Sequence, residues 1–172
     1  MKNLKPFALT ILLTAALSLT GCSSTQKKGD ESAAAGQSTD MGAVNDGLSI
    51  ELNADSDSGK AGSLRTVYFD FNSATLRSDT REALEANASF LKANPTVEVQ
   101  VEGHCDERGG VQFNLALGEK RASAVKDYLV AMGVEGKRIT TISFGKMRPV
   151  AFGHAEDAWS QNRRGNFVVT AK

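Results

Sequence analysis

The chain has 172 residues, of which 41% are apolar and 23% are charged, within the range of one soluble domain with additional segments. Its 20 Lys and Arg side chains balance 20 Asp and Glu side chains, and no basic stripe is interleaved with aromatic residues, so the sequence argues against a nucleic-acid-binding role. Of the two cysteines, Cys22 is accounted for by the N-terminal processing described next, which excludes a disulfide framework within one chain.

The N-terminus has the features of an export signal. Two lysines precede an apolar run over residues 7–19, which is the pattern of a secretory signal peptide and is too short for a comfortable membrane span. The run ends in Leu19-Thr20-Gly21-Cys22, which resembles the lipobox of bacterial lipoproteins, where cleavage precedes an acylated cysteine. We therefore predict a signal peptide over residues 1–21 and lipidation of Cys22; the alternative is an ordinary signal with a chance cysteine. In the sorting rule that this pattern resembles, Ser23 directs the lipoprotein to the outer membrane.

A polar segment follows the predicted cleavage site. Residues 22–63 are rich in Ser, Ala, Gly, Asp, Asn and Gln, and such a composition cannot bury enough apolar surface to offset the entropy of ordering. We predict a lipidated Cys22 followed by a flexible linker up to residue 63. As a coil of about 43 residues it would have a root-mean-square reach of ~35–40 Å. Leu48, Ile50 and Leu52 alternate with polar residues, which leaves open a short strand or docking segment.

The folded domain is predicted over residues 64–172. Val67, Phe69 and Phe71 alternate with polar residues as in a strand, and Ser78 or Asp79 supplies N-cap chemistry for a helix that stops before Pro95. Residues 96–102 alternate apolar and polar side chains, which predicts a strand with one buried face and one wet face.

The second half of the domain continues the alternation of helices and strands. A buried stripe at three-four spacing predicts a long helix over residues 115–132 that ends at Gly133. Strands are predicted over 139–144 and 165–170, with a short helix near 156–160. The expected fold class is α+β: a two-layer α/β sandwich with the order β-α-β-α-β-(short α)-β, a mixed four-stranded sheet, and helices packed on one side.

The candidate site lies in the loop after the second predicted strand. Asp106 belongs to an acidic loop bounded by Gly109 and Gly110, and Arg121 lies on the following helix, whose side chains lean back toward this loop. A carboxylate and a guanidinium held a few ångströms apart, both reaching solvent, suit a ligand that carries an ammonium and a carboxylate on one carbon. The alternative is that Asp106 and Arg121 merely pair with each other, and periodicity alone leaves both readings open.

Several stretches carry a resemblance to a known family. VYFDFN, VEGHCDERG, NLALGEKRA, YLVAMGV, SFGKMRP and NRR, together spanning residues 65–172, resemble the OmpA-like C-terminal domain family. With the lipobox, the similarity extends to the peptidoglycan-associated lipoproteins of the Tol-Pal system.

This resemblance implies a ligand and a set of residues that bind it. In the family, the aspartate binds the ammonium and the arginine binds the carboxylate of diaminopimelate in the stem peptide of the cell wall, and these residues correspond to Asp106 and Arg121. Further lining is implied for six residues: Phe71, Asn72, Asn114, Leu117, Arg163 and Arg164. The chain departs from the family at Asn72, where close relatives often have Asp, and at Cys105, where Thr or Ala is usual.

The resemblance also implies a biological role. It is that of a non-enzymatic outer-membrane lipoprotein without a cofactor, facing the periplasm, which tethers the membrane to peptidoglycan and supports envelope integrity and constriction at division. The implied partners are peptidoglycan, the outer membrane through acyl chains on Cys22, and TolB at a surface overlapping the wall site. Replacing Asp106 or Arg121 with alanine is expected to abolish most wall binding and to leave the fold intact.

Two alternatives belong to other functional classes. The first is a hydrolase that uses His104 and Cys105 as a metal site or a Cys-His nucleophile. Strand alternation places Cys105 toward the core and His104 on the wet face, so the two side chains would not share one ion, and a buried thiol is inert. The second alternative is a domain that serves only protein assembly and never contacts the wall.

Overall fold

The structure is a computed structural model that describes residues 50–172, so the predicted signal peptide, Cys22 and most of the predicted linker lie outside the described residues. In chain order the elements are β1 (Val67–Tyr68), α1 (Ser78–Ala93), β2 (Glu98–His104), α2 (Val111–Ala131), the 3-10 turn η1 (Gly136–Arg138), β3 (Ile139–Gly145), α3 (Glu156–Asn162) and β4 (Arg164–Ala171). Among these residues, no helix combines the length and apolar composition of a membrane-spanning segment.

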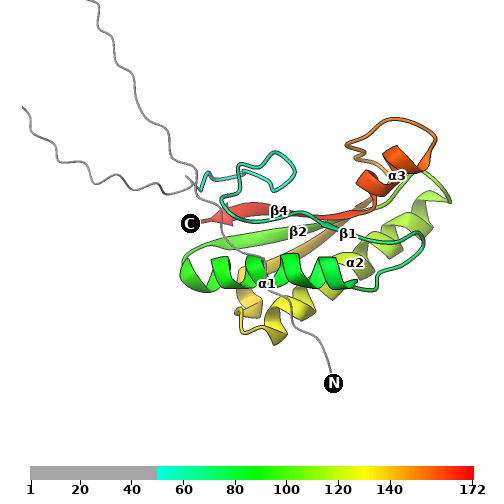
Figure 1. Cartoon of the computed structure of the whole chain (residues 1–172). Coiled ribbons are helices and arrows are strands. Elements are labelled where there is room, and N and C mark those ends of the chain that lie inside the picture. The colour runs from blue at the N-terminus through cyan, green and yellow to red at the C-terminus, as the bar shows by residue number, and fades with distance from the viewer. Residues whose placement is uncertain (1–49) are drawn as a thin grey trace, which may run out of the picture. The chain divides into compact units, whose positions relative to one another are not determined.

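The elements form two layers. The four strands make one mixed sheet in the order β1-β4-β2-β3, in which β2 and β3 are parallel and the other pairs are antiparallel. Helices α1 and α2 cover one face of this sheet (Figure 1). This confirms the predicted α+β class and the mixed four-stranded sheet.

The core lies between the sheet and the two long helices. Apolar side chains of β2 and β4 alternate toward the helices and meet the predicted stripe of α2. The buried side chains of these three elements include Val99, Val101, Phe167, Val169, Ala122, Val125 and Leu129. Burying a side chain of this size contributes roughly 1.5–3 kcal/mol, so this interface is the main source of the domain's stability.

Helix α2 ends as the sequence predicts. Gly133 has a φ of 91°, its N–H donates to the carbonyl of Val130, and the N–H of Val134 donates to the carbonyl of Leu129. These two hydrogen bonds make a Schellman motif, in which glycine takes the left-handed conformation with little strain.

Helix α1 does not use the predicted cap. It begins at Ser78 after an extended Arg77, and no side chain caps its first turn. The carboxylate of Asp79 instead accepts two hydrogen bonds from the guanidinium of Arg77. Asp79 in the first turn still stabilises the helix through its interaction with the helix dipole. The helix therefore forms where the sequence predicts it, although without the predicted cap.

The first strand is shorter than predicted, and this shapes the site. The chain leaves β1 after Tyr68, although Phe69 stays buried and its N–H donates to the carbonyl of Arg163 at 2.9 Å. Asn72 has a φ of 52°, in the left-handed region that Asn adopts more readily than most residues. Phe71 is therefore turned out of the sheet and is 58% exposed.

The face of the sheet that points away from α1 and α2 is less exposed to solvent than the alternation of apolar and polar residues predicts. Glu98 is exposed, but Glu102 and His104 are buried beside Asn166 of β4. The carboxylate of Glu102 is hydrogen-bonded to His104 Nε2 at 3.2 Å and accepts from Asn166 Nδ2 at 3.0 Å. Burial would raise the pKa of Glu102, but these hydrogen bonds outweigh it and the pKa lies below its ordinary value. The polar side chains on this face therefore bond to one another instead of facing water, although the buried Nδ1 of His104 has no hydrogen-bond partner among the described residues.

The prediction of a flexible linker up to residue 63 is wrong for its last part, residues 53–61, which pack against the folded domain. The N–H groups of Asn53 and Ser56 donate to the carbonyls of Val169 and Phe167, both at 2.9 Å, so this segment extends the pairing of β4 beyond β1. Ala61 is fully buried in the core. Backbone hydrogen bonds attach this segment to the sheet, so it needs few large apolar side chains. A prediction based on the number of such side chains therefore could not identify it as ordered.

The backbones of β2 and α2 approach closely at one point. A Cβ added to Gly103 would lie 1.9 Å from the carbonyl oxygen of Gly118 in α2. We predict that Gly103→Ala lowers the free energy of unfolding by about 1–3 kcal/mol, because the helix must shift away from the sheet to admit one methyl group. Urea denaturation checks this, with Gly136→Ala as the matched control because the nearest atom to a Cβ there is a methyl group of Val130 at 3.4 Å, an ordinary contact. Equal stability of the two variants would show that the contact is not tight.

Candidate functional site

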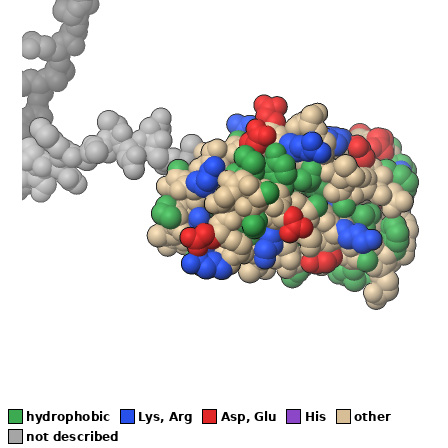
Figure 2. Space-filling model, turned by 90° about the horizontal axis from the view of Figure 1, so that it is seen from below, with side chains coloured by type: hydrophobic (Ala, Val, Ile, Leu, Met, Phe, Trp, Pro, Cys, Tyr) green, Lys and Arg blue, Asp and Glu red, His purple; other side chains and the backbone are tan. Residues whose placement is uncertain are grey.

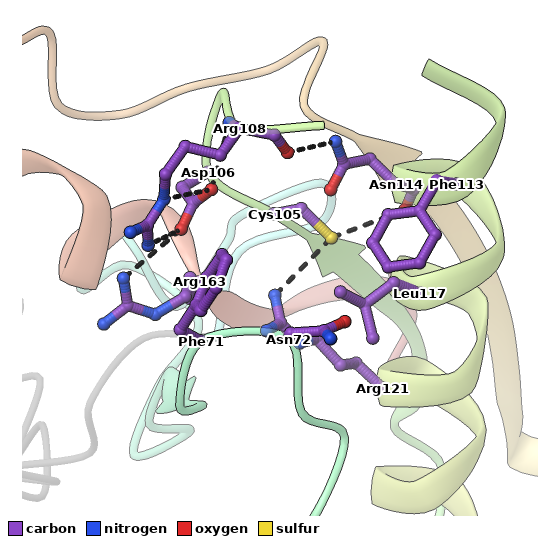
Figure 3. A pocket seen from close by; sticks show the side chains of 10 residues that line it. All are labelled: Phe71, Asn72, Cys105, Asp106, Arg108, Phe113, Asn114, Leu117, Arg121 and Arg163. Carbon is purple, nitrogen blue, oxygen red and sulfur yellow. Dashed lines mark hydrogen bonds and ion pairs between the residues drawn. The ribbon is translucent and has the colours of Figure 1, made fainter. Parts of the chain in front are cut away.

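A small cavity lies where the end of β2, the start of α2 and the loop after β1 meet (Figure 3). It encloses about 10 Å³, room for about one water molecule. Its lining is Phe71, Asn72, Cys105, Asp106, Arg108, Phe113, Asn114, Leu117, Arg121 and Arg163. Every residue named for the site from the sequence is present except Arg164.

Asp106 lies in this cavity as a buried carboxylate with two cationic partners. It is 3% exposed, and its Oδ2 accepts from Arg108 Nη2 at 2.6 Å and from Arg163 Nη1 at 3.3 Å. Its Oδ1 accepts from the backbone N–H and Nε of Arg108 at 3.1 and 3.2 Å. Burial acts to raise the pKa of Asp106, but the hydrogen bonds from Arg108 and Arg163 prevail and hold the pKa below its ordinary value. The carboxylate is thus charged and pre-oriented.

Arg121 is completely buried and is held by backbone carbonyls. Its Nε donates to Ser73 at 2.8 Å, Nη1 to His104 at 2.7 Å and Nη2 to Asp70 at 2.9 Å. Nη1 also lies 3.5 Å from Cys105 Sγ. Burial lowers the pKa of Arg121, and no carboxylate forms an ion pair with it in the part of the chain that the structure describes.

These contacts correct two expectations from the sequence. The alternative in which Asp106 and Arg121 merely pair is wrong, because Asp106 pairs with Arg108 and Arg163 instead. The expectation that both charges reach solvent is also wrong, since both residues are buried. Periodicity placed the two residues in one site but gave no information on depth, because depth is set by the loops that close over α2.

Asn114 orders the loop above the cavity. Its Nδ2 donates to the carbonyl of Arg108 at 2.8 Å and to that of Gly110 at 3.2 Å. Leu117 and Phe113 supply the apolar wall on α2 (Figure 3). Asn114 therefore stabilises the conformation of the acidic loop, whereas the side chain of Leu117 forms part of the cavity wall.

Arg164 lies away from the cavity. Its Nε donates to Asp57 Oδ2 at 2.7 Å, and its guanidinium is near the carbonyl of Arg148. Arg163 precedes β4 and turns toward Asp106, whereas Arg164 opens the strand, pairs with Tyr68 of β1 and points to the other side. Consecutive side chains of an extended chain point to opposite faces, so only one of the two arginines can reach the site.

Sequence reasoning missed Arg108 as a site residue. Its guanidinium carbon lies 3.9 Å from the ring centroid of Phe71 and 4.0 Å from that of Trp159, so it is held between two aromatic rings while it binds Asp106. The two aromatic partners of Arg108 are 37 and 51 positions away in the chain, so no local pattern indicates that its guanidinium is held at the site.

Glu107 connects the acidic loop to the region of α3. Its Oε1 lies 2.7 Å from His154 Nδ1 and accepts from Trp159 Nε1 at 2.9 Å. Lys146 Nζ donates to the carbonyls of Glu107 and Gly109 at 3.1 and 2.7 Å. The loop that carries Asp106 is thus fastened from the side opposite α2.

The contact with Glu107 raises the pKa of His154 above the ordinary value of about 6.5. A raised pKa means that the imidazolium–carboxylate pair is present below pH 6.5 and is lost as the pH rises through the folded-state pKa. We predict an NMR titration midpoint for His154 above 6.5, and a return to about 6.5 in Glu107→Gln. Equal midpoints in the two proteins would show that the pair does not form in solution.

The geometry does not suit the hydrolase alternative. The thiol of Cys105 is buried and donates to the carbonyl of Asn114 at 3.4 Å. Burial raises its pKa, which keeps it protonated and unreactive. His104 stacks on Phe144 instead of facing the thiol, and residues 50–172 hold no group of three or more His, Cys, Asp or Glu side chains suited to a metal ion.

The surface around the helices has no dominant charge. Figure 2, which views the domain from the helical side, shows Lys and Arg interspersed with Asp and Glu. On this face, therefore, no single sign of charge would attract a charged ligand over a long range.

The model of the OmpA family matches residues 68–163. The chain is 38% identical over 169 residues to a peptidoglycan-associated lipoprotein of Rhizobium meliloti, covering 98% of this chain and 91% of that protein. It is 39% identical over 173 residues to one of Pseudomonas aeruginosa, covering 95% and 97%. The crystal structure of the peptidoglycan-associated lipoprotein from Burkholderia pseudomallei superposes with a TM-score of 0.59 at 43% identity, covering 61% of this chain and 89% of that one.

Proposed function

Since this chain belongs to the OmpA family and, within it, to the peptidoglycan-associated lipoproteins, we propose that it binds peptidoglycan and tethers an envelope membrane to the cell wall without catalysing a reaction. The observation that carries this proposal is one cavity lined by a buried carboxylate and a buried guanidinium that do not pair with each other. Opposite charges kept apart in a shared cavity suit a zwitterionic ligand. The proposed ligand is the diaminopimelate of the stem peptide.

Asp106 is proposed to bind the ligand's ammonium. Its carboxylate is charged at neutral pH and already accepts hydrogen bonds from nitrogen donors in the geometry that an ammonium would use. A charge-assisted hydrogen bond of this kind contributes roughly 1.5–3 kcal/mol.

Arg121 is proposed to bind the ligand's carboxylate while it holds the cavity together. A guanidinium has five N–H groups, and the four contacts of Arg121 leave about one for a ligand. Among the described residues its guanidinium bonds to carbonyls and lies 5.1 Å from the ring centroid of Phe69, without an ion pair, so a nearby anion gains more electrostatic energy here than it would in water. The guanidinium therefore serves as a fixed positive site at the bottom of the cavity.

The cellular setting is proposed from the family and the N-terminal pattern. Acyl chains on Cys22 would anchor the protein in the outer membrane with the domain in the periplasm, where it would act in the Tol-Pal system and support constriction at division. TolB is the proposed protein partner. Exposed apolar side chains at the cavity, Phe71 and Phe113, with Val111 nearby on α2, support a protein contact that overlaps the wall site and competes with it.

Co-sedimentation with purified sacculi tests the proposed function. The full chain in mild detergent is expected to sediment with sacculi whose stem peptides carry diaminopimelate. It should sediment much less with sacculi that carry lysine at that position, because lysine lacks the second carboxylate. Soluble diaminopimelate should release the bound protein. Sedimentation with neither type of sacculus would refute wall binding, and equal sedimentation with both would refute the proposed ligand.

A further inference from the structure

The cation-binding position on Asp106 is already occupied by the chain itself. Arg108 reaches both oxygens of the carboxylate, through Nε at 3.2 Å and Nη2 at 2.6 Å. Figure 3 shows Arg108, Asp106 and Arg163 grouped at the side of the cavity away from α2. An ammonium that enters this site therefore meets a carboxylate with an internal cationic partner.

The two arginines on Asp106 are held very differently. The side chain of Arg163 is 7% exposed and is fixed by the carbonyl of Phe69 and the carboxylate of Glu156. The side chain of Arg108 is 30% exposed and belongs to a loop that continues into Gly109, which has a φ of 88°. Of the two, Arg108 is the residue that can move away without disrupting the core.

Aromatic stacking holds Arg108 in its occupied position. Its guanidinium lies between the rings of Phe71 and Trp159. Cation–π contacts at exposed sites contribute only about 0.5–1 kcal/mol each, and the carboxylate of Glu156, which is 64% exposed, lies 3.8 Å from Arg108 Nη2. Apart from these exposed partners Arg108 is held by Asp106 itself, the group for which the ligand's ammonium would compete. The cavity beside it is partly open and has about 10 Å³ of space, room for about one water molecule, so displacement of Arg108 would enlarge the space for an amino-acid head group at Asp106.

We propose that Arg108 is a gate that competes with the ligand's ammonium for Asp106 and thereby sets the affinity of the site. This inference rests on the proposed function, since it concerns the same ligand. When a binding-competent state is only partly populated, the apparent dissociation constant rises by the inverse of that fraction. A gate that is open about one tenth of the time weakens binding about tenfold.

Removal of the competing cation should strengthen binding. We expect Arg108→Gln in the full chain, in mild detergent, to bind meso-diaminopimelate and a diaminopimelate-containing muropeptide about 3- to 10-fold more tightly than the parent by calorimetry. Arg81→Gln is the matched control, since it makes the same charge change at an exposed position of α1 and should bind like the parent. Arg108→Ala repeats the test without a side-chain amide, and thermal unfolding confirms that each variant is folded.

The aromatic clamp provides an independent test of the same gate. Trp159→Leu should also tighten binding, by a smaller factor, because it releases Arg108. In the Arg108→Gln background the same substitution should have no further effect, since the two changes act through one gate. If Trp159 had only a structural role, Trp159→Leu would change the affinity by the same factor in the parent and in the Arg108→Gln background.

The outcomes separate the gate from the proposed function. Unchanged or weaker binding by both Arg108 variants, with a parent that binds, would overturn the gate and leave wall binding intact; weaker binding would identify Arg108 as a ligand contact. If neither the parent nor the variants bind diaminopimelate or the muropeptide, the proposed ligand fails and the gate with it.

Discussion

Asp106→Asn is expected to weaken binding to diaminopimelate-containing sacculi by about 10- to 150-fold, the equivalent of the roughly 1.5–3 kcal/mol that a charge-assisted hydrogen bond contributes. The substitution keeps the shape of the side chain and removes its charge, so an ammonium loses its counterion. Quantitative co-sedimentation over a range of sacculus concentrations measures the change. Asp127→Asn is the matched control, because it makes the same change at an exposed position of α2.

The pH dependence of binding provides a second check on Asp106. The hydrogen bonds from Arg108 and Arg163 outweigh burial and hold its pKa below the ordinary value, so the carboxylate remains charged as the pH falls from 7 to 5. Binding should therefore be nearly constant over that range. A loss of binding between pH 7 and 5 in the parent protein would show that a different group receives the ammonium.

Arg121→Met is expected to lower the free energy of unfolding by at least about 3 kcal/mol, since each of three carbonyls left without its donor costs roughly 1–3 kcal/mol, and to abolish binding. Methionine leaves the carbonyls of Asp70, Ser73 and His104 without their buried donor, and these carbonyls belong to two chain segments that Arg121 joins. This differs from the expectation that an alanine at this position would leave the fold intact. Urea denaturation measures the loss, with Arg81→Met as the exposed control. A variant as stable as the parent would show that water replaces the guanidinium without penalty.

The elements that the sequence predicted well are those whose signal is local. The alternation of Val97, Val99 and Val101 identifies β2, and the stripe that includes Val125 and Leu129 identifies α2, because both patterns reflect burial against one layer. The assignment of Asp106 to the site likewise followed from a short loop, although its detailed partners did not.

The features that the sequence did not predict depend on distant contacts. Arg108 is positioned by Phe71 and Trp159, and the segment around Asn53 is positioned by β4, more than 100 residues later. The family resemblance implies both Arg163 and Arg164 as lining, although strand alternation points the two side chains to opposite sides and only Arg163 reaches the cavity. In each case tertiary contacts decide the conformation, and a pattern read within one segment contains no information about them.

The pairing of residues 53–56 with β4 has a mechanical consequence. In the proposed tether, tension that arises when membrane and wall separate passes through residues 50–56, where the carbonyl of Ile50 accepts from Lys172 at 2.7 Å and the N–H groups of Asn53 and Ser56 donate to β4. Strand β4 is itself paired along its length with the inner strand β2, so the load passes into the middle of the sheet. Because Arg163 directly precedes β4 and Asp106 lies two residues after the end of β2, the strands that receive the load also carry two residues of the cavity.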